Sequence, residues 1–473
     1  MPRQILIVGG GIAGLASAIS LSKDLESAGS DVQITIFECA PEDEASSGGA
    51  ISLTPAAQQC LDTLGVLATL DDMGSQAGIE VDAIDLIALR SGNPLGPLRF
   101  TDEKGHGYGG YKGRRVLRRA LSQAMLAVAR RRPNITVHYN KKLLGGRLDH
   151  DLSSVTLHFE DGSSATGDLV LGCDGVHSAT RSRLVDPGNT SRYTGISFIQ
   201  SLCDARRLTS ELPFAQTAVH LARNSTLLTS FCDHDRATLF VAAVARVNEH
   251  LVERSQAAAA TATATVPAAP QDPTSMSKSI RHLVRSHFGQ TPLPYVHELI
   301  NSIPDWGLYP VYQVRQGGKW YTDRVLLLGD AAHAMPPRDE SAAYAIEDAL
   351  LFSQLLARRT PAQPFLTVFQ EYERLRRPTV NRAFDASSRL WQSDFDRGLY
   401  PDQIRDLMAP AYPPTDVMLG ARASAGDLSS ARRNGLPAPV HQSFSDLSVY
   451  SLTRDLDHAK LEEGRIAPYI SSG

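Results

Sequence analysis

The chain has 473 residues and a mass of 51.2 kDa, which predicts two or three domains with sizeable hydrophobic cores. Hydrophobic residues make up 42% and charged residues 21%, a globular composition that excludes a mainly disordered or fibrous chain. The net charge of −4 gives no electrostatic support for binding nucleic acid or an anionic membrane, so a small-molecule partner is favoured.

The cysteines also narrow the class of protein. There are five, an odd number, and no two form a CxxC pair, so neither a disulfide framework nor a zinc ribbon is indicated. We expect a reducing, cytoplasmic compartment and no metal site. Residues 5–21 are apolar, but four glycines and the charged residues that follow argue against a signal peptide or a membrane span.

The first forty residues predict one βαβ unit. It consists of a strand, a glycine turn, a helix and a second strand, at 5–8, 9–11, 12–28 and 32–38. Gly9, Gly11 and Gly14 allow a tight turn and a close approach of a dinucleotide diphosphate to the helix N-terminus. Glu38 ends the second strand, where its carboxylate can accept hydrogen bonds from ribose hydroxyls. The segment therefore predicts dinucleotide binding.

Further along the chain, residues 115–131 have the apolar spacing of a long amphipathic helix. ITVHY at 135–139 and VTLHF at 155–159, with the turn at 160–163, resemble a hairpin. The segment at 168–175, DLVLGCDG, predicts a buried strand that runs into a glycine turn.

The second half contains a separate β-rich region and then returns to alternating strand and helix. Residues 190–250 favour a sheet domain, and the Ala/Thr/Pro segment 257–275 is interpreted as a flexible insertion. We then expect helices near 277–288, 342–356 and 365–391, with the strand RVLLLGDAAH at 324–333. The segment beyond Pro401 carries no motif that we can interpret.

Three motifs occur in the order GGGIAG at 9–14, DLVLGCDG at 168–175 and RVLLLGDAAHAMPP at 324–337. Together they resemble the motifs of the class A flavoprotein monooxygenases, the family of p-hydroxybenzoate and salicylate hydroxylases. The resemblance covers residues 1 to about 395. It implies an α/β fold with a Rossmann-type FAD-binding domain, an inserted β-sheet substrate domain and a helical C-terminal region. The expected divisions are 1–185 and 306–395 for the FAD-binding domain, 186–305 for the substrate domain, and 396–473 for a C-terminal extension.

Matched residue by residue, the resemblance implies that FAD contacts Gly9, Gly11, Gly14, Glu38, Gly49, Ala50, Arg114, Asp174, Gly175, Asp330 and Ala343. Asp330 would bond the ribityl chain, and Asp174 with Gly175 belongs to a motif associated with both FAD and NADPH. Two alternative interpretations remain open. Asp174 could be a simple turn aspartate, and Arg114 could belong to a solvated basic face.

Other residues near these motifs receive structural interpretations. His333 is favoured as a satisfied buried histidine over a general base. Pro336 and Pro337 would fix a rigid loop beside the flavin ring. The chain departs from the family at 338–349, RDESAAYAIEDA, where the usual glycines are missing and where Ser341, Ala342 or Ala343 must make the backbone approaches.

The sequence indicates the substrate-binding residues less specifically than the FAD-binding residues. The strand that often carries an arginine in phenol-hydroxylating members offers Gln200, and Phe231 stands where a tyrosine is common, so no Arg/Tyr pair for phenolate activation is visible. The candidate pocket groups are Tyr193, His220, Arg223, Tyr309 and Tyr344. Each is favoured as a packing or surface residue, and no catalytic base is assigned.

The resemblance implies that NADPH reduces FAD, that O2 forms a flavin C4a-hydroperoxide, and that this species hydroxylates or epoxidises an electron-rich aromatic, polyketide or terpenoid substrate of secondary metabolism. Because only one complete GxGxxG is present, NADPH is expected to dock transiently. A flavin disulfide reductase lacks support because there is no CxxxxC pair, and a halogenase because WxWxIP is absent. A member that keeps the fold but has lost oxygenation is the remaining alternative.

Overall fold

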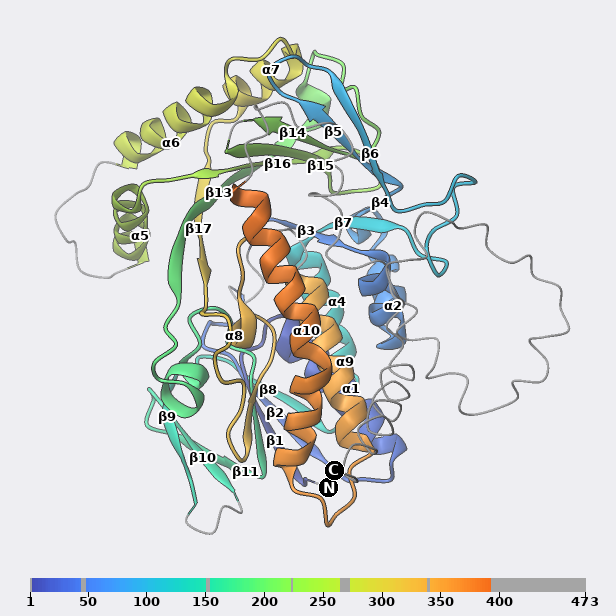
Figure 1. Ribbon diagram of the computed structural model, residues 1–473, viewed down its shortest axis with the longest axis vertical. Coiled ribbons are helices and arrows are strands. Elements are labelled where there is room, and N and C mark those ends of the chain that lie inside the picture. Colours follow the sequence, from blue (N-terminus) through green and yellow to red (C-terminus); the bar gives the residue numbers. More distant parts are fainter. Residues whose placement is uncertain are drawn as a thin grey trace, which may run out of the picture.

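The computed structural model describes residues 2–43, 48–149, 154–222, 224–263, 273–337 and 341–392 (Figure 1). The C-terminal extension, Arg223 and residues 338–340 therefore lie outside the described residues.

A five-stranded parallel sheet forms the lower part of the molecule in Figure 1. Its order is β18 (Val325–Leu327), β12 (Leu169–Gly172), β1 (Gln4–Val8), β2 (Gln33–Phe37), β8 (Ile135–His138). The central strand β1 is buried from Ile5 onwards, as expected of a parallel strand covered on both faces. Helix α1 (Ile12–Ser27) connects β1 to β2, so the predicted βαβ unit is confirmed.

The two faces of this sheet are covered by different elements. Ile7 faces α1, since its side chain contacts the position that a Cβ on Gly14 would take. Leu6 points the opposite way, against Gly167. Gly167 belongs to a three-stranded antiparallel sheet, β9 (Leu143–Leu148), β10 (Val155–Phe159) and β11 (Ser164–Gly167). On the helical face, α1 packs against both α4 (Arg118–Arg130) and α9 (Ser341–Ala357).

Two local predictions need correction. Residues 135–138 do not form a hairpin with β10, because they pair with β2 as the edge strand β8, whereas β10 pairs with β9 and β11. A short alternating strand fits either environment, so its pattern could not decide the partner. The long helix begins at Arg118, since Gly113–Leu117 is the strand β7, paired with β3 (Ala50–Leu53) and β4 (Ile79–Val81).

A seven-stranded mixed sheet forms the upper part of the molecule. Its order is β17 (Gly307–Gln313), β13 (Arg192–Asp204), β16 (Thr238–Arg246), β15 (Ser225–Phe231), β14 (Thr217–Ala222), β5 (Ala83–Ala88), β6 (Pro94–Arg99). Strands β5, β6 and β17 come from outside the expected 186–305 range. Helices α6 (Pro273–Phe288) and α7 (Pro294–Ser302) cover the face that points away from the parallel sheet (Figure 1).

The Ala-rich segment 257–275, expected to be a flexible insertion, is helical at both of its ends. Helix α5 (Glu249–Thr263) continues into it, and α6 begins at Pro273 within it. Alanine is a strong helix former, so the first half of the segment extends the helix that precedes it.

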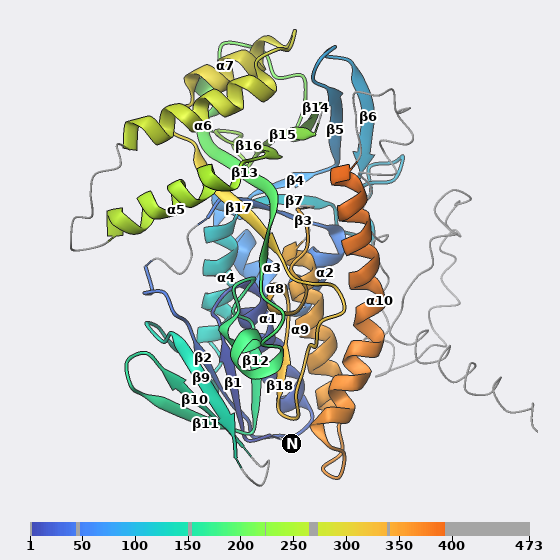
Figure 2. The same ribbon diagram turned by 60° about the vertical axis from the view of Figure 1, so that its left-hand side comes forward.

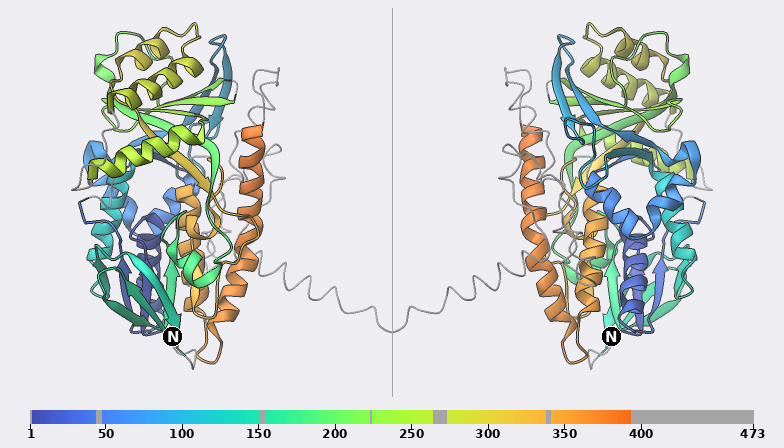
Figure 3. Two further views of the ribbon diagram at one scale, coloured as in Figure 1. Left: turned by 90° about the vertical axis from the view of Figure 1, so that its left-hand side faces the viewer. Right: turned by 90° about the vertical axis from the view of Figure 1, so that its right-hand side faces the viewer.

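The remaining elements are short helices and one long one. They are α2 (Pro55–Thr63), α3 (Val66–Asp71), η1 (Gly74–Ala77), η2 (Arg181–Val185), η3 (Ala205–Arg207), α8 (Asp330–His333) and α10 (Phe365–Gln392). Helix α10 runs along one side of the molecule from the lower part to the upper sheet (Figures 2 and 3). None of the helices in the described ranges is long and apolar enough to span a bilayer.

His220 and Tyr295 form a buried polar pair between the upper sheet and α7. The Nδ1 of His220 lies 2.8 Å from the carbonyl oxygen of Leu227, so Nδ1 carries the proton and Nε2 accepts from the Tyr295 hydroxyl at 2.5 Å. Burial lowers the pKa of His220 to about 4. This candidate pocket group is therefore a neutral core histidine.

We predict that Tyr295→Phe lowers the free energy of unfolding by about 1–3 kcal/mol, because it leaves Nε2 of His220 buried without a donor. Urea unfolding at pH 7 followed by circular dichroism measures the change. Tyr309→Phe is the control, since Tyr309 is 49% exposed. Equal midpoints for the two variants would contradict the prediction.

Candidate functional site

The three sequence motifs meet at the carboxyl ends of the adjacent strands β1, β12 and β18. A Cβ on Gly9, at φ +101°, would lie 2.4 Å from the carbonyl oxygen of Cys173, so the turn after β1 touches the end of β12. Gly329 follows β18, and a Cβ on it would lie 3.2 Å from that of Ala13 in α1. Loops distant in sequence thus lie side by side, where ligands bind in open α/β sheets.

The glycines of the first motif have different physical roles. A Cβ on Gly14 would lie 1.9 Å from the carbonyl oxygen of Gly9, so glycine is needed there for the helix to pack on its own turn. A Cβ on Gly11 would meet nothing within 4 Å. Gly11 caps α1 without a side-chain hydrogen bond, and no acidic residue occupies the first turn. The helix therefore presents free amide groups suited to an anion.

Glu38 lies beside this turn at the end of β2. Its Oε2 accepts from the amide of Gly10 at 2.7 Å, and its Oε1 accepts from the amide of Ala40 at 2.8 Å. The carboxylate is thus held in a fixed position next to the glycine turn. Oε1 also accepts from the thiol of Cys39 at 3.3 Å, whereas Oε2 has a second lone pair that could accept a ligand hydroxyl.

Asp174 has the contacts of a turn aspartate, the alternative left open by the sequence. It accepts from the hydroxyl of Ser178 at 2.5 Å and from the amide and hydroxyl of Thr180 at 2.9 and 3.0 Å. Burial raises the pKa of its carboxyl, and these hydrogen bonds oppose that shift. Gly175 adopts φ +73° in the same turn, so the backbone here is the part left to meet a ligand.

Arg181 joins the second motif to the third. Its buried guanidinium donates to the carbonyl oxygens of Asn189, Ala331 and Val176 at 2.8, 2.8 and 2.6 Å. Each of its three guanidinium nitrogens donates to a backbone carbonyl, so Arg181 holds the two loops together.

Asp330 and Arg118 have opposite charges, and neither side chain forms a hydrogen bond with a described residue. Asp330 begins α8, where burial raises the pKa of its carboxyl and the charges of His333 and Arg118 act against that rise. Arg118 is exposed at the start of α4, its amide donates to the carbonyl of Gly49, and its Cδ lies 2.9 Å from where a Cβ on Gly48 would be. This pair provides an acceptor and a cation for a ligand beside the strand ends.

Arg114 does not occupy the position that the resemblance gave it. It lies within β7, and its guanidinium bonds Asp71 at 2.6 Å and the carbonyl of Ala77 at 3.2 Å. The arginine that opens the long helix is Arg118, which the sequence comparison missed because β7 was taken as the first turn of α4. A helix start placed at Arg118 would have identified it.

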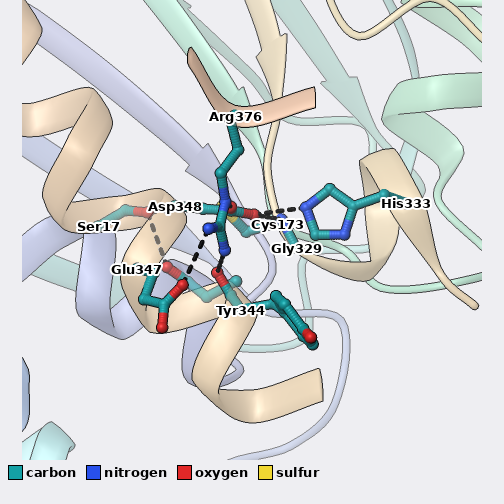
Figure 4. A network of polar contacts seen from close by, with 9 residues as sticks. Ser17, Cys173, Gly329, His333, Tyr344, Glu347, Asp348 and Arg376 are labelled. Atoms are coloured by element: carbon teal, nitrogen blue, oxygen red, sulfur yellow. Dashed lines mark hydrogen bonds and ion pairs between the residues drawn. The ribbon is translucent and has the colours of Figure 1, made fainter. Parts of the chain in front are cut away.

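A buried network lies directly behind the third motif (Figure 4). Asp348 on α9 accepts from the amide of Gly329 at 2.8 Å, and its two oxygens lie 2.7 Å from His333 Nε2 and 2.5 Å from Arg376 Nε. Arg376 also contacts Glu347 at 2.9 Å. Burial raises the pKa of Asp348, but His333 and Arg376 outweigh it and hold the pKa well below its usual range. His333 is thus a buried, paired residue.

The remaining predicted residues are dispersed. Gly49 and Ala50 lie at the start of β3, near Gln200 and Phe240 of the upper sheet. Ala343 is buried in the core on α9. The other pocket groups are structural or peripheral: Tyr193 bonds Ser197 and the Val247 carbonyl, Tyr344 lies beneath Arg376, and Tyr309 is on β17 at the sheet edge.

These contacts fit a dinucleotide cofactor. The bare N-terminus of α1 at Gly11 suits a diphosphate, and Glu38 and Asp330 are acceptors for hydroxyl groups. Arg118 supplies a positive charge. No group of three or more potential metal ligands occurs among the described residues.

We predict that Asp348→Asn destabilises the protein by about 3–5 kcal/mol, because Arg376 and His333 lose a buried anion. Since folding lowers the pKa of Asp348, its contribution is present at neutral pH and is lost as the pH falls below about 4. Urea unfolding at pH 7 measures the loss. Glu371→Gln, which removes the partly exposed partner of Arg374, should cost less than about 1 kcal/mol; a similar cost for both variants would refute the prediction.

The comparisons with known proteins agree with this geometry. The profile of the family described as "FAD binding domain" matches residues 3–387. A 3-amino-4-hydroxybenzoate 2-monooxygenase from Streptomyces platensis is 29% identical over 80% of this chain and 85% of its own. A 6-hydroxynicotinate 3-monooxygenase from Bordetella bronchiseptica is 25% identical over 80% and 89%. Among solved structures, a salicylate hydroxylase substrate complex matches with a TM-score of 0.62 at 21% identity, covering 86% of this chain and 92% of its own. The chain belongs to the FAD binding domain family and is an FAD-dependent monooxygenase of the class A flavoprotein type.

Proposed function

We propose that this monooxygenase uses NAD(P)H and O2 to hydroxylate or epoxidise an electron-rich aromatic compound of secondary metabolism. The observation that carries the proposal is the convergence of three loops on one site, where the side chains of Asp330 and Arg118 form no hydrogen bond with a described residue and the N-terminus of α1 is uncapped by a side chain. The names of the relatives, a hydroxybenzoate and a hydroxynicotinate monooxygenase, favour an aromatic substrate.

Different residues would bind different parts of FAD. The amides at Gly11 would bind the diphosphate, Glu38 the ribose hydroxyls, and Asp330 the ribityl chain, while Arg118 neutralises negative charge. Gly49 and the loop at Pro336–Pro337 would border the flavin ring. All five cysteines are free, which supports a cytoplasmic location.

When bound and reduced, FAD supplies the activation of O2, one atom of which enters the substrate while the other leaves as water. The chain's own residues bind, orient and exclude water. Arg181 and Asp348 fix the loops from behind, so that the cofactor contacts are positioned before binding. The largely apolar face of the upper sheet, which packs against Ala50 and Leu117, would limit the access of water to the reacting atoms.

One prediction of this proposal concerns the residues assigned to FAD, Arg118 and Asp330, with Arg114 as the comparison. Arg118→Met and Asp330→Ala should each weaken FAD binding by about tenfold or more, because each removes one hydrogen bond or charge, with little change in unfolding free energy. Arg114→Met should instead lower stability by about 1–3 kcal/mol and leave the FAD affinity of the folded protein unchanged. Flavin fluorescence titration and urea unfolding separate the two effects. A loss of affinity in Arg114→Met alone would restore the original assignment.

Another prediction of this proposal concerns the reaction itself. The purified protein should retain or take up FAD, oxidise NAD(P)H faster with an aromatic substrate, and raise the product mass by one oxygen atom that derives from labelled O2. A protein that binds FAD but never transfers labelled oxygen would instead be a member that has lost oxygenation.

A further inference from the structure

The seven-stranded sheet has two chemically different faces. One face packs against α6 and α7 and contains Ile199, Val241 and the His220 pair. The opposite face contains Phe198, Phe240 and Ala242, and it packs against Ala50 and Leu117 of β3 and β7. The second face therefore lies over the loop that borders the proposed flavin site, and we call it the inner face.

Strand register shows that the centre of the inner face is uncharged. Three rows of directly paired residues cross the sheet: Gly307, Gln200, Ala242, Leu228, Val219, Leu86; then Tyr309, Phe198, Val244, Thr226, Leu221; then Leu202, Phe240, Ser230, Thr217, Ile84. None of these residues is ionised near neutral pH. The charged residues at the ends of the face are already engaged, Arg246 with the carbonyl of Trp391 and Asp204 with Arg206. Arg118, whose amide bonds Gly49, lies outside this sheet at the start of α4, and its charge is assigned to FAD under the proposed function.

Gln200 is the polar group of the inner face that lies closest to the flavin loop. Its Nε2 is 2.6 Å from the position that a Cβ on Gly49 would take. The side chain is half-buried, and no described residue forms a hydrogen bond with its amide. A glutamine amide can both donate and accept a hydrogen bond, but it cannot neutralise a carboxylate.

A buried carboxylate needs a cation or several donors, because its desolvation is costly. A phenol hydroxyl or a neutral carbonyl needs only one or two hydrogen bonds. We propose that this enzyme selects uncharged aromatic substrates, that Gln200 orients them by a hydrogen bond, and that carboxylated aromatics are disfavoured. The inference rests on the proposed function and differs from what the hydroxybenzoate and hydroxynicotinate relatives suggest.

The test uses the FAD-loaded enzyme and two matched pairs of ligands, salicylamide with salicylate and 4-hydroxybenzamide with 4-hydroxybenzoate. Each is titrated while the visible flavin spectrum is followed. We expect at least one amide to bind about tenfold or more tightly than its acid. Gln200→Leu should weaken the binding of the amide without tightening the binding of the acid. Gln200→Arg should instead shift the ratio of the two affinities towards the acid by about tenfold. Ser201→Ala, on the opposite face of the same strand, should change neither.

Acids that bind as tightly as their amides, or amides that give no saturable response, would overturn the inference. So would a Gln200→Leu variant that keeps the wild-type affinities. These results are distinct from a failure of the proposed function, which would be seen as a protein that takes up no FAD or transfers no oxygen from O2.

Discussion

The close contact between the turn after β1 and the end of β12 is the constraint on which the site depends. It requires backbone against backbone, and only glycine at position 9 allows that approach. With this contact made, Arg181 can reach from the second motif to the carbonyl of Ala331, and the third motif is fixed beside the first. The helix end and Asp330 then face the same region. Binding groups that are in place before the ligand arrives lose little conformational entropy when it binds.

The sequence predicted those parts whose signals are local. Glycine spacing, the buried run ILIV and the Asp-Gly turn each depend on neighbouring residues, so the parallel sheet, α1 and the order of the motifs were predicted. The family resemblance was also confirmed. The boundary between β7 and α4 was wrong by three residues, and this moved the arginine assignment from Arg118 to Arg114. Apolar residues flanked by arginines fit both a strand and a helix, so the pattern alone could not place the boundary.

Other features could not be predicted because they join distant residues. Asp348 gathers donors from Gly329, His333 and Arg376, and nothing in the segment around residue 348 indicates these partners. The pairing of β14 with β5 joins residues more than a hundred positions apart, which made the substrate sheet larger than expected. The role of Gln200 depends on which face of β13 turns towards Gly49. Periodicity shows that the faces alternate but does not show which one is inner.

Helix α10 connects the two halves of the molecule. Near its middle Arg376 is fixed by Asp348, and near its end Trp391 donates to the carbonyl of Pro337 at 2.8 Å. Fifteen residues of helix span about 22 Å between these anchors. Pro378 lies just after the first anchor and lacks an amide hydrogen, so bending concentrates there. Arg246 of β16 also donates to the carbonyl of Trp391, so the end of this one helix joins the upper sheet to the proline loop.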